Sequence, residues 1–335
     1  MTISILPPAP ASPVDSQGRP AVGAYQGYID RVSWEGLRGP SARNALYRRF
    51  HRKTWHFVSL GGEQCMVAFA IVDVGYASSA FAYVFDRRAR RLLGDLTFTG
   101  LPGTARVADT AGPGACSRYQ GAQASFLVER QRGSATWTIR ARGPAGLVVD
   151  ATVDASAEPP ALCAVAEIAG GVANCTHKTV CLPVCGSAGA FDVRFDLAGS
   201  FAAFDHTCGL LARDTRWRWA AASSAAVGFN LVEGFNGEVE NGVWLDGRLL
   251  KVGAAEFRYD PKATMAPWRI RTVDGVIDLE FTPEGERRED KNLLVAVSRY
   301  VQPIGTFRGT IKPPGEPARE IAGLLGVTED HVAKW

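Results

Sequence analysis

The sequence lacks the short motifs that mark several large enzyme classes. It contains no G-x-S-x-G nucleophile elbow, no phosphate-binding P-loop and no H-E-x-x-H zinc motif. Its glycine-rich stretch GFNGEVENG is not followed by a helical pattern, which argues against a dinucleotide site. No run of about 18 apolar residues occurs, so we expect no segment to span a membrane. The commonest hydrolase, nucleotide-dependent and metalloprotease chemistries are therefore disfavoured.

An excess of one charge sign is also absent. The chain carries 37 Lys and Arg against 34 Asp and Glu, a formal net charge of +3, which gives no electrostatic reason to expect a nucleic-acid partner. The start MTISILPPAPASPVD has no basic residue and several prolines, which argues against a signal peptide. We therefore expect a cytoplasmic protein.

Cysteine is sparse and odd in number. Seven cysteines fit a reduced protein better than a disulfide framework. One group has to be weighed as a metal site, and it comprises Cys163, Cys175, Cys181 and Cys185 with His177 among them. Its irregular spacing differs from the C-x2-C pairs of structural zinc, so we interpret the cysteines as small buried side chains. We predict no metal and no other cofactor.

The first 50 residues differ from the rest of the chain. Residues 1–30 are rich in Pro, Ala and Gly and are interpreted as a poorly ordered lead-in. Ser41 is a candidate cap for a short basic helix over residues 42–50. A basic helix can lie on an anionic membrane surface, so peripheral membrane contact stays open. The thin apolar face of this helix favours a solvated surface helix.

From Trp55 onward the pattern alternates with period two and is interrupted by frequent turn signals, which is typical of antiparallel sheet. Gly-Gly and Asp-Gly dipeptides predict three hairpins. The predicted partners are Leu60 with Glu63 and His56 with Val67, then Leu245 with Arg248, and last Arg271 with Asp278, Arg269 with Glu280 and Trp268 with Phe281. We interpret the charged pairs of the third hairpin as structural.

Two stretches align as an internal repeat. Placing VAFAIVDVGY (67–76) on VGFNLVEGFN (227–236) matches Phe69 with Phe229 and Asp73 with Glu233. The repeat predicts two copies of one all-β unit, and chance similarity of two β-rich stretches is the alternative. Each apolar stripe ends in a carboxylate, which either faces a ligand cavity or leaves the core for solvent.

A tryptophan-rich run follows Asp205 and His206. Within it, Trp217 and Trp219 share one face of a strand, while Arg216 and Arg218 lie on the other. We interpret it as a strand whose indoles line an interior and whose guanidinium groups meet carboxylates outside, with plain core packing as the alternative. Asp205 and His206 point to opposite faces of a regular strand, and a bend would bring both to one rim. His206 is a candidate general acid or base.

Several long motifs resemble the bacterial family of unknown function numbered 2804. They are KTWHF (53–57), DVGYASSAFAYVFD (73–86), THK (176–178), DHTCGLLARDTRWRWA (205–220), GFNLVEGFNGEVENGVWLDG (228–247), WRIR (268–271), SRYVQPIGTFRG (298–309) and GVTEDHVAKW (326–335). The likeness runs from about residue 20 to the last residue. That family is in turn similar to the two-barrel lipocalin-like, or calycin, group that includes carotenoid hydratases, tocopherol cyclases and decalin-forming cyclases.

The resemblance implies an all-β fold built as a tandem of two lipocalin-like antiparallel β-barrels or opened barrels. We place the first domain at residues 31–190 and the second at 191–335. Ligands in the group are large and apolar, so a hydrophobic small molecule such as a lipid, terpenoid or polyketide is the expected partner. An exposed edge strand of an opened barrel leaves a homodimer open.

Two functional hypotheses follow. One is a cofactor-independent hydratase, isomerase or cyclase with Asp205, His206, Glu233 and Asn241 as its catalytic groups. The other is a non-catalytic lipid carrier in which Asn230 and Asn241 orient a head group. Under either hypothesis the expected ligand contacts are Trp55, His56, Asp73, Tyr76, Tyr83, His177, Trp217, Trp219, Asn230 and His331.

Overall fold

Two curled antiparallel sheets make up almost the whole molecule. The computed structural model describes residues 6–292 and 297–335, with residues 291 and 292 described by their backbone alone. The first sheet contains β1 (Gly23–Gln26), β2 (Arg52–Gly61), β3 (Cys65–Asp73), β4 (Ser78–Asp86), β5 (Arg91–Gly100), β6 (Ala105–Arg106), β7 (Cys116–Gln120), β8 (Ser125–Glu129), β9 (Thr136–Arg142), β10 (Val148–Asp154), β11 (Leu162–Glu167), β12 (Ala173–Ala190), β13 (Val193–Asp196) and β14 (Ser200–Leu210). The second contains β15 (Asp214–Ser223), β16 (Val227–Gly234), β17 (Gly242–Leu245), β18 (Arg248–Lys251), β19 (Ala255–Arg258), β20 (Trp268–Thr272), β21 (Ile277–Asn292), β22 (Val297–Ile311) and β23 (Arg319–Lys334).

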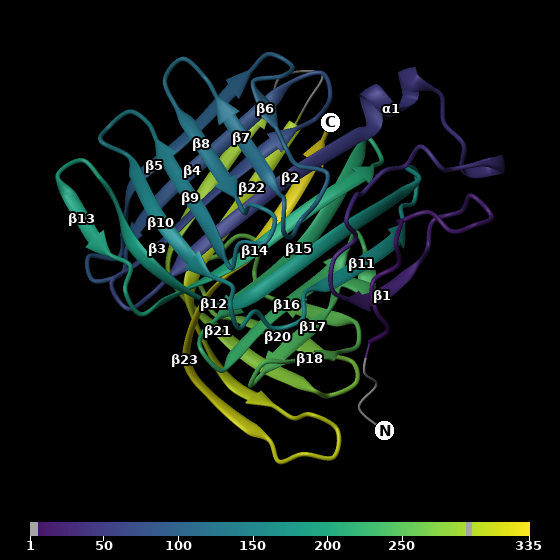
Figure 1. Ribbon diagram of the computed structural model, residues 1–335. Coiled ribbons are helices and arrows are strands. Elements are labelled where there is room, and N and C mark those ends of the chain that lie inside the picture. The colour runs from purple at the N-terminus through teal and green to yellow at the C-terminus, as the bar shows by residue number, and fades with distance from the viewer. Residues whose placement is uncertain (1–5, 293–296) are drawn as a thin grey trace.

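The first sheet curls into a nearly closed barrel, and the second forms a half-barrel (Figure 1). The strand order of the first is β5-β4-β3-β2-β14-β12-β10-β9-β8-β7-β6, and that of the second is β18-β17-β16-β15-β23-β22-β21-β20-β19. Each concave face holds its own apolar core. Phe69, Phe126 and Trp137 belong to the first core, and Phe229 and Phe281 belong to the second. The expected tandem of opened lipocalin-like barrels is therefore confirmed.

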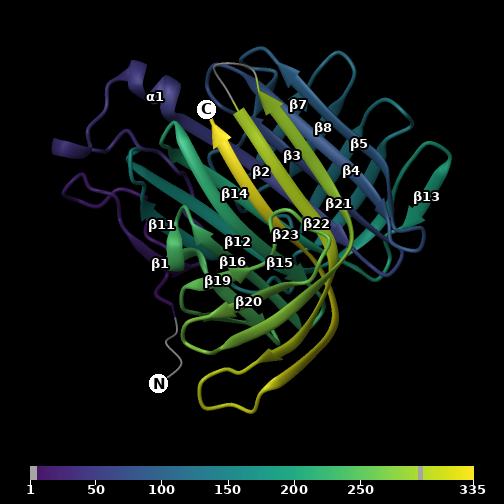
Figure 2. The same cartoon turned by 180° about the vertical axis from the view of Figure 1, so that it is seen from behind.

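The two sheets meet through their outer, convex faces. Figure 2 shows β21, β22 and β23 running across β2, β3 and β4. Phe57 and Phe85 of the first sheet share an apolar cluster there with Trp219 and Ile304 of the second. Strand alternation explains the arrangement, because each of these strands sends one set of side chains into its own core and the next set toward the other sheet.

Two of the three predicted hairpins are confirmed. Leu245 pairs with Arg248, and the third hairpin has all three predicted pairs. Within it, Arg269 and Arg271 both reach the Asp278 carboxylate, at 3.2 and 3.0 Å, which supports a structural role.

The predicted register of the first hairpin was wrong. Leu60 pairs with Val67 and His56 with Ile71, because β2 continues through Gly61 and the chain turns later. The Gly62 amide donates to the carbonyl of Cys65, and the Arg87 guanidinium donates to the carbonyls of Gly62 and Glu63, which fixes the longer turn.

One α-helix occurs among the described residues, α1 (Ala45–His51), together with the short 3-10 turns η1 (Gly39–Ser41) and η2 (Gly237–Glu240). Its cap is Asn44 and not Ser41, since the Asn44 side chain accepts from the amide of Tyr47 at 2.8 Å. Within residues 6–292 and 297–335, no helix combines the length and apolarity that crossing a bilayer requires.

The segment before α1 packs on the first sheet. β1 pairs with β11, and Ile29 is completely buried. Residues 1–5 of the expected lead-in lie outside the described residues. The sheets divide between Leu210 and Asp214, and the domain boundaries at residues 30 and 190 stay predictions.

A close approach at Gly285 gives a test of the packing between the sheets. Gly285 follows a bulge in β21, and a Cβ atom there would lie 2.3 Å from the Phe85 ring of the first sheet. We predict that Gly285→Ala lowers the free energy of unfolding by about 1–3 kcal/mol, measured in urea. The control is Gly36→Ala, where the nearest atom lies at 3.5 Å. Equal stability of the two variants would contradict the packing.

Candidate functional site

A cavity of about 280 Å³ lies between the two sheets. The first sheet contributes Trp55 and Phe57 to its walls, and the second contributes Trp217, Trp219 and Val232. From the sequence we expected a ligand inside a barrel. The cavity instead lies against the outer faces of the sheets, and the barrel interior holds the apolar core. The residues of its walls thus lie outside the two concave cores.

Three indole rings dominate the wall. Trp55 and Trp217 stack with their ring centres 6.0 Å apart, and Phe57 meets Trp219 edge-on at 5.6 Å. Each indole N–H is bonded to a polar group: Trp55 donates to Asp205, Trp217 to Glu329 and Trp219 to Asn230. These bonds fix the ring planes and leave their faces for the cavity.

The opposite face of β15 carries the expected arginines. Arg216 lies 3.7 Å from the Asp330 carboxylate, and Arg218 pairs with Glu233 of β16. The alternation read from the sequence therefore describes this strand, with indoles toward the cavity and guanidinium groups toward carboxylates outside it.

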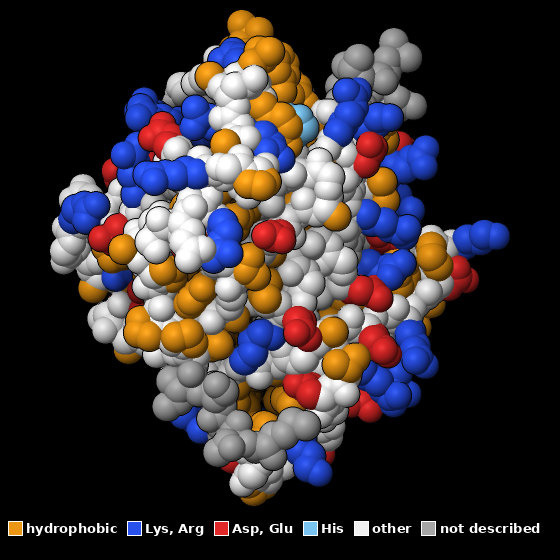
Figure 3. Space-filling view, turned by 90° about the vertical axis from the view of Figure 1, so that its right-hand side faces the viewer, with side chains coloured by type: hydrophobic (Ala, Val, Ile, Leu, Met, Phe, Trp, Pro, Cys, Tyr) orange, Lys and Arg blue, Asp and Glu red, His pale blue; other side chains and the backbone are white. Residues whose placement is uncertain are grey.

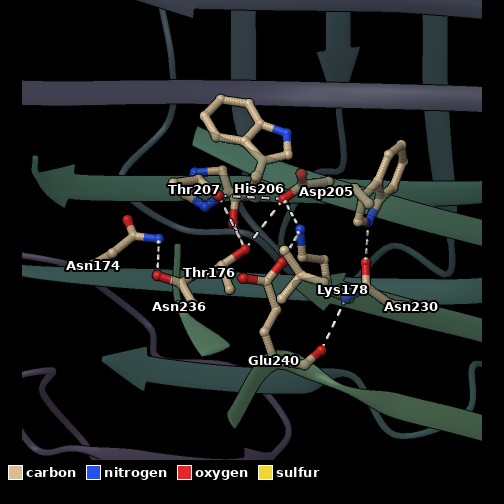
Figure 4. A network of polar contacts seen from close by, with 12 residues as sticks. Asn174, Thr176, Lys178, Asp205, His206, Thr207, Asn230, Asn236 and Glu240 are labelled. Carbon is tan, nitrogen blue, oxygen red and sulfur yellow. Dashed lines mark hydrogen bonds and ion pairs between the residues drawn. The ribbon is translucent and has the colours of Figure 1, made fainter. Parts of the chain in front are cut away.

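A buried lysine sits at one end of the cavity, between carboxylates from two parts of the chain (Figure 4). Lys178 Nζ lies 2.7 Å from Asp205 Oδ1 on β14 and 2.7 Å from Glu240 Oε1 on η2. Burial lowers the pKa of Lys178, but the two carboxylates outweigh it and raise the pKa above its ordinary value. Lys178 is therefore a fixed cation, and it ties the first sheet to the segment between β16 and β17.

Neutral donors complete this polar cluster (Figure 4). The hydroxyls of Thr176 and Thr207 donate to Asp205 Oδ1 at 3.1 and 3.2 Å. Asn236 donates to Glu240, and Asn230 donates to the carbonyl of Glu240 at 2.9 Å. These bonds hold the Asp205 carboxylate in place. It can therefore stabilise a positive charge on a ligand in the cavity as well as the charge of Lys178.

A second carboxyl group, Glu329 of β23, faces the cavity from the other sheet. It accepts from Trp217 Nε1 at 2.7 Å and from Gln302 Nε2 at 2.8 Å. The Tyr83 hydroxyl donates to the amide oxygen, Oε1, of Gln302 at 2.6 Å. Burial raises the pKa of Glu329 to about 7 even though the indole of Trp217, the amide of Gln302 and the hydroxyl of Tyr300 favour the carboxylate. Glu329 can therefore hold or release a proton near neutral pH.

Other polar groups surround Glu329. His331 Nε2 lies 3.1 Å from the Ser298 hydroxyl, and burial lowers the pKa of His331, so its ring is neutral. The Tyr300 hydroxyl is buried next to Glu329, and burial together with this carboxyl group raises the pKa of Tyr300. The Arg287 guanidinium is held by Asp95 at 2.7 Å and lies against the Phe81 ring at 4.3 Å.

The residues expected from the sequence divide into three groups. Six line the cavity, namely Trp55, Tyr76, Asp205, Trp217, Trp219 and His331. Two support its wall, since Asn230 bonds Trp219 and Tyr83 bonds Gln302. Six lie away from it, namely His56, Asp73, His177, His206, Glu233 and Asn241.

Strand alternation explains the placement of His206 and His56. No bend brings His206 to the side of Asp205, so its Nε2 bonds the carbonyl of Ala108 at 2.7 Å within the first sheet's concave side. His56 lies beside it, with ring centres 5.3 Å apart, and its Nδ1 is 3.0 Å from the Ser117 hydroxyl. Burial lowers the pKa of His206 to about 4.

The other residues outside the cavity have structural contacts. Asp73 accepts from the amide of Gly75 in the β3–β4 turn, and Glu233 is bound to Arg218. Asn241 accepts from the amide of Val232 at 2.7 Å and donates to the carbonyl of Gly253 at 3.0 Å. Asn241 thereby connects the segment after η2 to β16.

His177 belongs to a buried group of possible metal ligands. Its donor atoms and those of Cys163 and Cys175 lie within 4.8 Å of one another. The amide of Ile29 donates to His177 Nε2 at 3.1 Å, so Nε2 is already used and a ring proton lies on Nδ1. A metal at Nδ1 would have to displace that proton, which disfavours a metal centre here. The prediction of no metal stays a prediction.

Sequence reasoning missed Lys178, Glu240, Tyr300 and Arg287 as site residues, and it included Glu329 only within the motif GVTEDHVAKW. The sequence did contain a signal for Lys178. In the motif THK, strand alternation places Lys178 on the same face as Thr176 and on the face opposite His177. Glu240 carried none, since it lies in a turn whose position depends on the tertiary fold.

Comparison with known proteins places the chain in a family. The model for the Domain of unknown function (DUF2804) matches residues 8–335. The chain belongs to this family. No curated protein matches it.

Three solved structures of other proteins share the fold of this DUF2804 member. Kievitone hydratase from Nectria haematococca superposes with a TM-score of 0.54 at 10% identity and covers 100% of this chain and 98% of its own. CghA, solved with Sch210972, gives 0.53 at 10% identity with 85% and 88% covered. The AttH candidate from Nitrosomonas europaea gives 0.51 at 13% identity with 88% and 96% covered. At these identities the likeness shows the fold alone.

The buried lysine gives a second test. Replacing Lys178 by Met leaves Asp205 and Glu240 facing each other without their cation, so we predict a loss of about 3–5 kcal/mol in the free energy of unfolding. Adding Glu240→Gln should recover part of that loss in urea denaturation. The exposed Lys312→Met is the matched control. A Lys178→Met protein as stable as this control would contradict the ion cluster.

Proposed function

We propose that this protein binds an apolar small molecule in the cavity between its sheets and transforms it by cofactor-independent acid–base chemistry, as a hydratase, isomerase or cyclase. The observation that carries the proposal is Glu329, a buried carboxyl group with a pKa of about 7 beside an aromatic cavity. The shared fold with kievitone hydratase and with CghA supports a small-molecule site.

The geometry suits protonation of a double bond or a carbonyl. Protonated Glu329 gives its proton to the ligand, and the positive charge that develops lies among the faces of Trp55 and Trp217. The carboxylate of Asp205 stabilises the same charge from the first sheet. Return of a proton to Glu329, after attack by water or by a second double bond, completes the cycle. The three reactions differ in the fate of the cation: water attacks it in hydration, a second double bond attacks it in cyclisation, and it loses a proton from another carbon in isomerisation.

The test of this role is Glu329→Gln, which keeps the acceptor oxygen and removes the proton. The probe is farnesol, an unsaturated apolar alcohol, with products followed by mass spectrometry and binding followed by quenching of tryptophan fluorescence. We predict that turnover falls at least about 100-fold while the Kd changes little. In the unaltered protein kcat/KM should be constant below pH 7 and fall about tenfold per pH unit above it, because the acid must be protonated.

The surface variant Glu233→Gln is the matched control and should behave as the unaltered protein. If the unaltered protein binds farnesol and related polyenes with no product at any pH, the enzyme proposal fails and the lipid-carrier hypothesis replaces it.

The charges of the cavity wall predict which ligands it rejects. Asp205, Glu240 and Glu329 are acidic, and the two buried cations, Lys178 and Arg287, each already contact two carboxylates. The third cation of the lining, Lys334, is half-exposed, so a ligand carboxylate at the buried end of the cavity would have no cation of its own. We predict that farnesoic acid binds at least about tenfold more weakly than farnesol at pH 8, measured by the same fluorescence quenching. Equal or tighter binding of the acid would contradict this reading of the wall.

A further inference from the structure

The cavity between the sheets opens toward the end of the molecule that carries α1. Its deeper lining, such as Phe57, Trp219 and Tyr300, is buried, whereas Tyr76, Ser298 and Trp335 are half-exposed. Tyr76 lies in the turn between β3 and β4. This half-exposed end is the mouth of the cavity.

The helix α1 is fixed beside this mouth. The ring centres of Phe50 and Tyr76 are 5.8 Å apart, and Lys53 Nζ donates to the carbonyls of Phe50 and Val74. On the inward side of the helix, His51 Nδ1 lies 2.8 Å from the carbonyl of Leu211. The helix is thus held to the body by one side and to the rim of the mouth by its end.

The outward side of α1 is apolar and uncovered. Leu46 and Phe50 are one turn apart, so they share a face, and they are 67% and 50% exposed. Leu101, which is 81% exposed, lies just beyond β5, and its neighbour Gly100 pairs with Ser78 next to the same β3–β4 turn. Large apolar side chains therefore stand in solvent on two sides of the mouth.

The segment that carries α1 has basic residues and no acidic one. Between Glu35 and Glu63 it carries Arg38, Arg43, Arg48, Arg49, Arg52 and Lys53. Arg52 pairs with Asp73 at 3.7 Å and Lys53 is buried, so the arginines before Arg52 supply the surface charge of this segment. Figure 3 shows hydrophobic side chains gathered at the top of this side of the molecule with Lys and Arg side chains next to them. Apolar side chains ringed by arginines match an interface of anionic head groups over hydrocarbon.

We propose that α1 docks the protein on an anionic lipid bilayer with the mouth of the cavity against the membrane. Leu46 and Phe50 enter the head-group region, and Arg49, which lies beside their face of the helix, meets a lipid phosphate. A ligand dissolved in the bilayer then reaches the indole-lined cavity without crossing water. The docking itself does not depend on the chemistry proposed for Glu329.

The test is sedimentation of the full chain with vesicles of phosphatidylcholine, with or without phosphatidylglycerol. We expect binding only to the anionic vesicles, and weaker binding at high salt. Arg49→Gln should reduce the partition coefficient about fivefold. Leu46→Ser with Phe50→Ser should reduce it at least about tenfold. All three side chains lie on the surface helix, and thermal unfolding checks that both variants fold.

Matched controls exist on other parts of the molecule. Arg88→Gln removes the same charge at the β4–β5 turn, at the other end of β4. Phe191→Ser removes an aromatic ring that is 58% exposed beside β13, which lies across the molecule from α1 (Figure 1). Both controls should bind anionic vesicles as the unaltered protein does.

Failure of the unaltered protein to bind anionic vesicles would overturn the proposal, and so would equal binding by the α1 variants and their controls. Specific capture of an acidic protein by α1 in place of vesicles would overturn it as well. The docking and the chemistry fail separately, because Glu329→Gln should bind vesicles normally and the α1 variants should turn over farnesol supplied in solution.

Discussion

The burial of one lysine between two carboxylates constrains the rest of this structure. Lys178 comes from the first sheet, and Glu240 comes from the turn that follows β16 of the second. A buried charge is tolerated only when the groups that pair with it are held in place, so neighbouring residues must fix Asp205 and Glu240. Thr176 and Thr207 do so for Asp205, and Asn230 and Asn236 do so for Glu240. The relative position of the sheets at this end is thereby fixed.

The same constraint positions the cavity wall. Asn230 holds Glu240 through its amide and Trp219 through its oxygen, and Asp205 holds both Lys178 and Trp55. The aromatic lining is thus attached to the ion cluster by hydrogen bonds in addition to packing. At the other wall, Glu329 fixes Trp217 in the same manner. Each carboxylate has a structural partner and a surface toward the cavity, which makes the site rigid before any ligand enters.

Much of the fold could be predicted from the sequence, because local rules govern it. The Asp-Gly turns set the register of two hairpins, and period-two alternation placed Trp217 and Trp219 opposite Arg216 and Arg218. Some failures arose where distant segments decide. The first hairpin depends on Arg87, and the position of Glu240 depends on the contact between the convex faces, which no local pattern contains. The other failures were local. Ser41 lies in the turn η1, so Asn44 caps α1, and β14 alternates regularly without the bend that would bring His206 beside Asp205.

The location of the cavity affects how freely such a protein can change its ligand. Each sheet closes its own core on its concave side, and the cavity wall is built from the side chains that remain on the outer faces. A substitution such as one at Val232 or Phe57 alters the shape of the binding space and leaves the residues of both concave cores in place. The two concave cores are therefore separate from the cavity wall. The wall residues Phe57 and Val232 also belong to the apolar cluster that joins the sheets, so a change of ligand is limited by how the sheets pack on each other and not by how each sheet folds.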